Sequence, residues 1–599
     1  MTWPSIGDYA LIGNCRAAAL VCRDGSLEWL CLPTFSSPSV FGAILDRRAG
    51  HFAIRPRGKY TSTRRYLPRT NVLETTFHCE GGGVLRVTDC MPLPAEPSGE
   101  MQADHELDPE HEVLRKVACT EGEVEVEVEF APRPRYGLRR AGFRDCGKLG
   151  WQLTGCAFGA FLRTDIPLRG NDAMLRGTAQ LRAGDVRWCS LAYDESEASV
   201  LPPLGKWAER RLGDTAGWWR WWTGRCAYQG EYGEQVLRSA LTLKMLASAT
   251  SGAVLAAPTT SLPEAVGGER NWDYRFCWVR DSAFVLHAFL SLGFVEEGEG
   301  FLGWLLHATR LSWPRLQVMY DLYGETRLKE KELAHLSGYR DSRPVRIGNA
   351  AHEQLQLDIY GELIATVAQY VDSGGELDST ERRMVQGLGR SVCRLWRKPD
   401  QGIWETRGPA RHHTYSKAMC WVALDKLMHL GLGDATMERE RRALREEIEA
   451  RGFSERLGGY VGYYGGEDPD AALLLLARHG YHPPEHPRMQ GTWRLIRERL
   501  SRDGLLQRYP LDSGYDGVSG GENAFAPCTF WAAEYLANLG RREEAREIFE
   551  RLLGCANDVG LYAEEIVPGS GEPIGNFPQA FTHVSMISAA TALTVEKTA

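Results

Sequence analysis

Two stretches of the chain place carboxylic acids among aromatic and glycine residues, where a carboxyl group could transfer a proton. In the run Asp400–Glu405, a glycine turn carries Trp404 next to Glu405. Contact with an apolar ring disfavours the charged carboxylate, so it raises the pKa of the acid toward the value that a general acid needs. The alternative for this run is an exposed turn with a solvated glutamate.

The second stretch lies near the C-terminus and contains the adjacent pair Glu564 and Glu565, followed by the glycine- and proline-rich residues 571–579. Neighbouring carboxylates are often a solvated charge patch. Here the aromatic, proline and amide residues around the pair favour a shaped site. Loops on a rigid scaffold are a frequent location of such sites.

Two further loops combine arginines with polar residues. Residues 270–281 contain three arginines, two aspartates and four aromatic residues. In a sugar site, aromatic faces cover the C–H faces of a pyranose ring, while arginine and aspartate bind its hydroxyl groups. Alternatively, Arg280 and Asp281 cap the next helix and pair with each other. Residues 341–349 carry Arg343 and Arg346 around a proline. These arginines could bind a ligand or form an internal salt-bridge lattice, and the sequence leaves both alternatives open.

The elements that must position these loops change in character along the chain. The first 200 residues or so read as short strands: 18–22 and 26–30 flank Asp24-Gly25, a strong hairpin signal. Residues 123–130 alternate valine or phenylalanine with glutamate, which is typical of a half-solvated antiparallel strand. Many short strands separated by turns predict a β-sandwich.

From about residue 232 onward, apolar residues recur with helical period. The tryptophan-rich segment 206–226 reads as a linker helix, with an aromatic ligand platform as the alternative. About a dozen helices follow, and paired hairpins of this number can close into a double-layered toroid. An open solenoid is the alternative, although no fixed-period repeat supports one. The predicted helices span 236–246, 283–292, 297–309, 353–371, 381–396, 416–430, 437–451, 471–480, 486–500, 523–539, 543–555 and 580–594.

Composition argues against several classes of function. The net charge of −8 is a poor match to nucleic acid, whose binding surfaces are basic. We see no signal peptide and no apolar run long enough to cross a bilayer. The 15 cysteines are scattered without a C-x-x-C pair, which favours free thiols in a reducing cytoplasm. No metal-binding or dinucleotide-binding pattern is present, so we expect neither a metal nor an organic cofactor.

In their order along the chain (270–281, 341–349, 400–405 and 561–583), the four loops resemble those of glycoside hydrolase family 15, the glucoamylase and trehalase family. The runs Ile6–Arg16 and Asp24–Pro33 are similar to the opening of its prokaryotic trehalase-like branch. The resemblance implies a multidomain fold: an N-terminal antiparallel β-sandwich (1–203), a linker helix (204–230) and a catalytic all-α (α/α)6 barrel (231–599). Val567 and His413 depart from the family pattern, which affects the aglycone side.

The resemblance also implies roles for individual residues. Glu405 matches the general acid and Glu564 the general base of an inverting hydrolysis, in which two carboxyl groups lie about 6.5–9.5 Å apart. Arg280 and Asp281 match the pair that holds the non-reducing glucose. The other predicted substrate-binding residues are Trp272, Asp273, Trp278, Arg343, Arg346, Trp404 and Glu565.

Several functions remain open at this point. The N-terminal match favours hydrolysis of α,α-trehalose, and glucoamylase-like hydrolysis of malto- or isomalto-oligosaccharides is the next candidate. A noncatalytic glucan-binding protein and a phosphorylase on a similar toroid are further alternatives. The expected partner is an α-linked glucose disaccharide or oligosaccharide rather than nucleic acid or membrane, and a homo-oligomer is possible.

Overall fold

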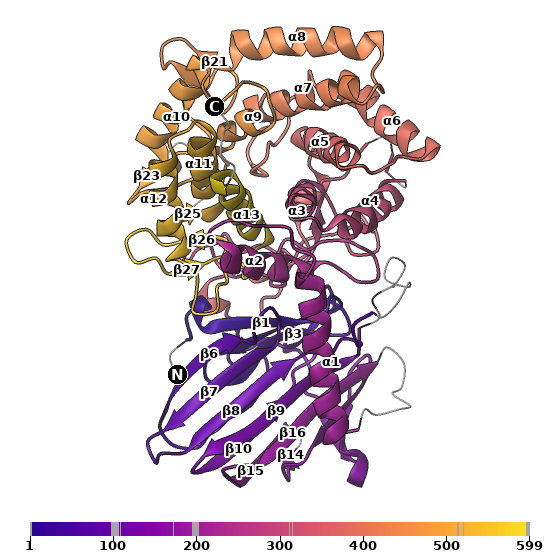
Figure 1. Ribbon diagram of the computed structural model, residues 1–599, viewed down its shortest axis with the longest axis vertical. Helices are drawn as coiled ribbons and strands as arrows, with labels where there is room; N and C mark the ends of the chain where they lie inside the picture. Colours follow the sequence, from indigo (N-terminus) through magenta and orange to yellow (C-terminus); the bar gives the residue numbers. More distant parts are fainter. Residues whose placement is uncertain are drawn as a thin grey trace.

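A computed structural model describes residues 3–97, 107, 109–171, 173–194, 203–310, 312–313, 315–511, 514–518 and 520–594. Two layers of strands occupy one end of the molecule and a ring of helices the other (Figure 1). Helix α1 (Lys206–Thr223) runs along the strands toward the helices. The predicted limits at 203 and 230 lie in the connections on either side of α1 and remain predictions.

The β-sandwich consists of two antiparallel eight-stranded sheets, as the strand pattern predicts. The first sheet has the order β1-β2-β3-β5-β10-β15-β14, with β4 beside β3, and the second has the order β11-β12-β13-β16-β9-β8-β7-β6. The strands of the first are β1 (Tyr9–Gly13), β2 (Ala18–Cys22), β3 (Ser26–Cys31), β4 (Ser39–Phe41), β5 (His51–Pro56), β10 (Glu123–Ala131), β14 (Arg169–Asn171) and β15 (Met174–Arg182). Those of the second are β6 (Tyr60–Tyr66), β7 (Leu73–Cys79), β8 (Val84–Cys90), β9 (Glu112–Glu121), β11 (Gly142–Asp145), β12 (Trp151–Thr154), β13 (Gly159–Thr164) and β16 (Val186–Asp194).

Local sequence explains the strands that were predicted best. Gly25 in the β2–β3 hairpin has a φ of +83°, and a Cβ atom there would lie 2.2 Å from the carbonyl oxygen of Ile54, so only glycine fits. In β10 the apolar residues are buried, whereas Glu123 and Glu125 are exposed. The alternation therefore reports which face of the strand packs on the second sheet.

The helices form a closed double ring. In the described part of the chain, the inner ring runs α3, α5, α7, the short pair η6–α9, α11 and α13, and α13 contacts α3. This closure confirms the toroid and excludes the open solenoid. The inner elements are α3 (Val279–Ser291), α5 (Asp358–Asp372), α7 (Thr414–His429), η6 (Ala471–Leu474), α9 (Leu475–Arg478), α11 (Ala526–Asn538) and α13 (Ala580–Thr594). The outer helices are α2 (Gly233–Leu246), α4 (Val295–Thr309), α6 (Ser379–Leu395), α8 (Ala435–Arg451), α10 (Pro487–Leu500) and α12 (Arg542–Leu553).

One predicted helix begins too early. The sequence predicts a helix from residue 353, but α5 begins at Asp358. The preceding segment is bound by the neighbouring loop: the Leu357 amide donates to Asp400 (3.0 Å), and the Gln354 side-chain amide donates to the carbonyl oxygens of Glu405 and Thr406 (3.2 Å each). Tertiary contacts therefore override the helical pattern there.

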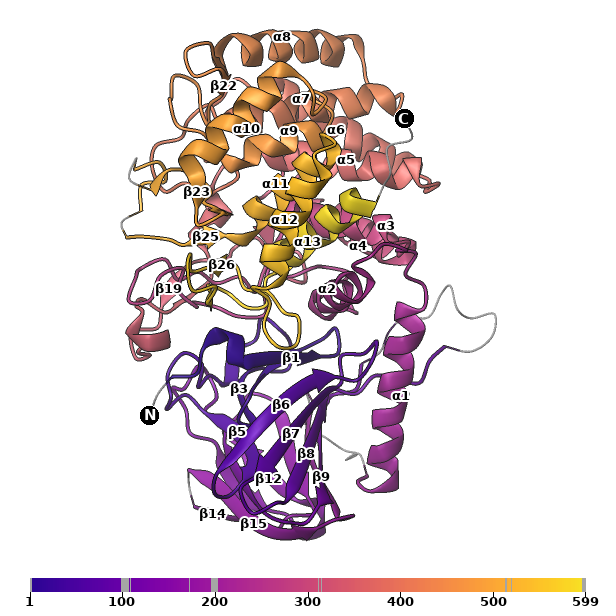
Figure 2. The same ribbon diagram turned by 60° about the vertical axis from the view of Figure 1, so that its left-hand side comes forward.

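The loops that precede the inner helices gather at one end of the barrel. Short strands of these loops, β25 (Ala524–Phe525), β26 (Glu565–Ile566) and β27 (Pro573–Ile574), lie on the side of the β-sandwich (Figure 2). Within the described residues, no helix is both long and apolar enough to cross a membrane. All fifteen cysteines belong to this part of the chain, and none forms a disulfide in it.

Candidate active site

A pocket opens where these loops converge, and the free space within it and at its open mouth is about 710 Å³. Six residues predicted from the sequence line it: Trp272, Trp278, Arg280, Asp281, Trp404 and Glu405. Loops that are far apart in the chain therefore meet around one cavity.

The backbone directs Glu405 into this pocket. Gly402 and Glu405 both have positive φ values, +67° and +57°. The side chain of Asp400 accepts from the Gly402 amide at 3.2 Å and fixes the turn. A non-glycine residue in the left-handed region costs free energy and is often found at functional sites. The turn thus holds a partly exposed carboxyl group at the wall of the cavity.

The immediate partners of Glu405 differ from the sequence prediction. The indole N–H of Trp278 donates to Glu405 Oε1, and Arg280 Nη2 lies 3.4 Å from the same oxygen. Trp404 instead donates its indole N–H to both carboxylate oxygens of Asp470, each at 2.9 Å. Trp404 is therefore a wall of the pocket, and Trp278 and Arg280 orient the carboxyl group of Glu405.

Arg280 and Asp281 occupy the first turn of α3, as the sequence indicates. Arg280 donates to Gln356 at 2.9 Å and to Asp358 at 3.3 Å, and lies 3.6 Å from Asp281. Burial raises the pKa of Asp281 to about 6. Among the described residues, Asp281 Oδ2 has no hydrogen-bond partner and no side chain caps the start of α3. Arg280 and Asp281 Oδ2 thus form an ion pair at 3.6 Å, and an Oδ2 that accepts no hydrogen bond from the described residues can also accept one from a ligand.

Glu564 lies behind the pocket wall. The Tyr274 hydroxyl donates to its Oε1 at 2.6 Å, and the Asn576 amide donates to its Oε2 at 3.1 Å. Tyr274 lines the pocket, whereas Glu564 is fully buried and is not among the lining residues of the described chain. The rings of Tyr274 and Trp278 meet edge to face with centroids 5.4 Å apart. Glu405 and Glu564 are thus linked through this pair of rings. Burial raises the pKa of Glu564.

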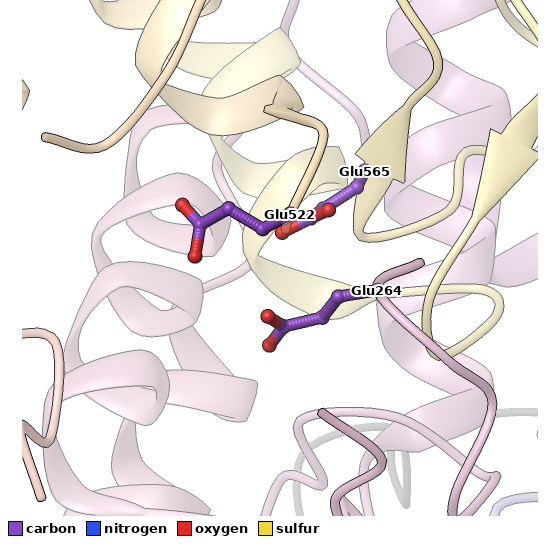
Figure 3. A group of neighbouring side chains, drawn as sticks. All are labelled: Glu264, Glu522 and Glu565. Atoms are coloured by element: carbon purple, nitrogen blue, oxygen red, sulfur yellow. The ribbon is translucent and has the colours of Figure 1, made fainter. Parts of the chain in front are cut away.

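A cluster of carboxyl groups around Arg508 borders Glu564. Arg508 Nη2 lies 3.1 Å from Glu264, 2.6 Å from Glu522 and 3.5 Å from Glu565, and the three carboxylates are drawn in Figure 3. Burial raises the pKa of Glu264 to about 8 and that of Glu565 well above its usual range, so protons are retained here at neutral pH. Oxygens of the three glutamates approach within 4.8 Å of one another, but the guanidinium group already supplies the cation between them.

Four other predicted site residues do not line the pocket. Asp273 forms a buried ion pair with Arg275 at 2.7 Å, and the Gly348 amide donates to Asp273 at 3.1 Å. Arg343 is exposed and bonds the carbonyl oxygen of Ser337. Arg346 donates to the carbonyl oxygens of Glu269 (2.7 Å) and Asn271 (3.1 Å), just before Trp272. Glu565 faces the Asn523 amide at 2.7 Å and Arg508. These residues hold the loops in place instead of forming the wall.

A loop that the sequence analysis did not single out supplies part of the wall. Arg508, Tyr509, Asp516 and Val518 come from the segment between α10 and α11, and Glu264 precedes the predicted loop 270–281, whose first residue, Arg270, also lines the pocket. Residues 505–525 combine glycines, aromatic residues and charges just before a helix. The other loops were chosen on that same signal, so it could have identified this one.

Comparisons with known proteins agree with this geometry. The family model for glycosyl hydrolases family 15 matches residues 230–591, and the model for trehalase-like N-terminal domains matches residues 2–155. The chain belongs to glycosyl hydrolases family 15. As a member of this family it is a glycoside hydrolase.

Relatives extend over almost the whole chain. A trehalase of Mycolicibacterium smegmatis is 38% identical and covers 98% of this chain and 91% of its own length. A trehalase of Thermoplasma volcanium is 36% identical, with coverages of 99% and 94%. Among solved structures, a bacterial glucoamylase complexed with acarbose matches with a TM-score of 0.72 at 13% identity, covering 99% of this chain and 94% of that chain. The structural match shows the same fold, an N-terminal sheet domain followed by an α/α barrel.

Proposed function

We propose that this family 15 hydrolase cleaves α,α-trehalose with inversion, using Glu405 as general acid and Glu564 as general base. The observation that supports it best is the link from Glu405, in the pocket wall, through Trp278 and Tyr274 to Glu564, which lies behind that wall. Trehalase relatives that cover nearly the whole chain support the choice of trehalose.

The proposed reaction is a single displacement. Arg280 and the Oδ2 of Asp281, which accepts no hydrogen bond from the described residues, bind hydroxyl groups of one glucose unit. Glu405 donates its proton to the glycosidic oxygen as the bond to the anomeric carbon breaks. A water that reaches the opposite face gives a proton to Glu564 and forms the new bond, so the products are one β-glucose and one α-glucose.

Two features keep Glu564 suited to the role of base. Its oxygens accept from Tyr274 and from the Asn576 amide, and both bonds stabilise the carboxylate. Burial raises the pKa of Glu264 to about 8, which favours its neutral form. A neutral Glu264 does not repel the carboxylate of Glu564.

A glucoamylase-like activity on malto- or isomalto-oligosaccharides is the second candidate, because a bacterial glucoamylase shares this fold. We also retain the proposal of a cytoplasmic enzyme, since the chain carries fifteen free cysteines. A homo-oligomer also remains a prediction.

The test measures glucose release from trehalose, maltose and isomaltose, with proton NMR of the first-formed anomers. We expect trehalose to be the best substrate and to yield equal amounts of α- and β-glucose at early times. Glu405→Gln and Glu564→Gln should each keep the melting temperature and lose nearly all turnover. Preferred cleavage of maltose would reassign the substrate, and two α-glucose products would exclude inversion.

A further inference from the structure

The charged side chains of the pocket differ in how far they are exposed to solvent. The side chain of Arg280 is 6% exposed, that of Glu405 is 20% exposed and that of Arg407 is 29% exposed. Glu405 acts at the bond between two sugar units in the proposed reaction, so the sugar held by Arg280 lies on the inner side. The leaving sugar then lies on the outer side, toward Arg407, which places Arg407 at the mouth of the pocket.

Four side chains form a connected structure at this mouth, which we call the rim clamp: Trp272, Glu330, Arg346 and Arg407. The guanidinium groups of Arg346 and Arg407 each lie 4.6 Å from the centre of the Trp272 ring. Glu330 joins them, 3.1 Å from Arg407 and 3.5 Å from Arg346. The Trp272 indole N–H donates to Glu264 at 3.1 Å, so the ring is fixed at its edge as well as by the guanidinium groups.

A second set of bonds ties the rim clamp to the opposite loop. The backbone amides of Arg407 and Gly408 both donate to the carbonyl oxygen of Asp516, at 2.7 and 3.1 Å. The side chain of Asp516 accepts from Arg270 and, at 2.9 Å, from the Tyr509 hydroxyl. Arg407 and Asp516 both line the pocket, so the two loops are bridged beside the cavity. The mouth is therefore built from mutually fixed groups with few free rotamers.

We propose that the rim clamp determines chain-length selectivity: Arg407, held by Glu330 and Trp272, closes the outer end of the leaving-sugar site and excludes a third glucose unit. This inference rests on the proposed hydrolysis of an α-glucoside at Glu405. A rigid wall that clashes with longer chains gives selectivity without a new attractive contact to the disaccharide.

The experiment uses malto-oligosaccharides as competitive inhibitors of trehalose hydrolysis by the full-length enzyme. This series has one linkage and varies only in length, so length is separated from linkage. In the wild type we expect an inhibition constant for maltotetraose at least about tenfold above that for maltose, the order of discrimination that a steric pocket wall provides. Arg407→Ala should lower this ratio by about tenfold, and Glu330→Gln should lower it by less, because the arginine remains but is no longer anchored.

Arg411→Ala is the matched control, because Arg411 comes from the same loop but stacks on Tyr463, 4.3 Å from its ring centre, and does not line the described pocket. It should leave the ratio unchanged. The inference is overturned by a wild-type ratio near one, by an unchanged ratio in Arg407→Ala and Glu330→Gln with wild-type melting temperatures, or by an equal change in Arg411→Ala. If the wild type does not cleave trehalose, the proposed function fails, and the same ratio is then measured against the α-glucoside that it does cleave.

Discussion

Replacing Tyr274 by phenylalanine tests how the buried base is kept ionised. The substitution removes one hydroxyl group, whose 2.6 Å bond to Glu564 is one of the two direct hydrogen bonds to that carboxyl group among the described residues. A hydrogen bond to a charged group is worth about 1.5–3 kcal/mol, which corresponds to a loss of activity of roughly 10- to 150-fold. The ring stays in place, so the edge-to-face contact with Trp278 should persist.

The sign of the pH effect follows from the state that the hydrogen bond stabilises. Burial already raises the pKa of Glu564, and the Tyr274 hydroxyl opposes this by favouring the carboxylate. Without it, the pKa of Glu564 rises further, and the acidic limb of the kcat/KM profile moves to higher pH. Activity should therefore recover partly as the pH is raised.

The assay is a profile of kcat/KM on trehalose against pH for the wild type and Tyr274→Phe, with melting temperatures as the control for folding. A loss of activity that is the same at every pH would mean that Tyr274 only shapes the pocket. An acidic limb that stays in place would show that Glu564 is not the group that must be ionised, and the assignment of the base would be wrong.

Three further predictions concern Trp278, Asp470 and Glu362. Trp278→Phe removes the indole N–H that orients Glu405, so kcat should fall about tenfold with little change in KM, measured by steady-state kinetics. Asp470→Asn weakens the bidentate acceptor of the Trp404 N–H, so KM should rise more than kcat falls; a change in kcat alone would contradict a wall function for Trp404. Burial raises the pKa of Glu362 from 4.5 to about 8, so its contribution to stability is present below pH 4.5 and lost as the pH rises through 8. Glu362→Gln should remove this loss of folding free energy, which is at most roughly 5 kcal/mol, and the melting temperature should then vary less with pH over that interval. If the melting temperatures of both proteins vary with pH in parallel, Glu362 is not protonated in the folded state.

Periodic segments of the sequence predicted outer helices such as α12 because these bury one face, whereas the inner helices α11 and α13 are apolar and buried almost all round. The pattern fails where tertiary bonds compete with local preference. Residues 354–357 continue the helical pattern of α5, yet Gln354 is extended and bonds the carbonyl oxygen of Glu405, and the Leu357 amide bonds Asp400. The predicted helix 471–480 divides into η6 and α9. Nothing in the local pattern reports a bond to a residue more than forty positions away.

Loop composition predicted which segments meet, but not which side chains face the cavity. Arg346 and Arg280 are both arginines in chemically rich loops, yet one bonds backbone carbonyl oxygens and the other lines the pocket. The difference lies in their surroundings: Arg280 stands in the first turn of α3 and lines the pocket, while Arg346 stands in the short strand β20 (Arg346–Ile347) and bonds the loop before Trp272. Composition carries no information on that direction, so Asp273, Arg343 and Glu565 could not be separated from the residues of the wall.

The β-sandwich bears on the site through the loop that carries Trp278 and Arg280. Arg275 in this loop neutralises the buried Asp273 and also donates to the carbonyl oxygen of Ser37 in the sandwich at 3.1 Å. Trp29 of strand β3 donates its indole N–H to the carbonyl oxygen of Pro258 at 2.7 Å, in the loop that leads to Glu264. An ion pair as buried as Arg275–Asp273 needs such additional bonds to be tolerated, because each charge loses its hydration. The sandwich supplies the bond from Ser37, so the wall of the pocket depends on a domain none of whose described residues lines the pocket.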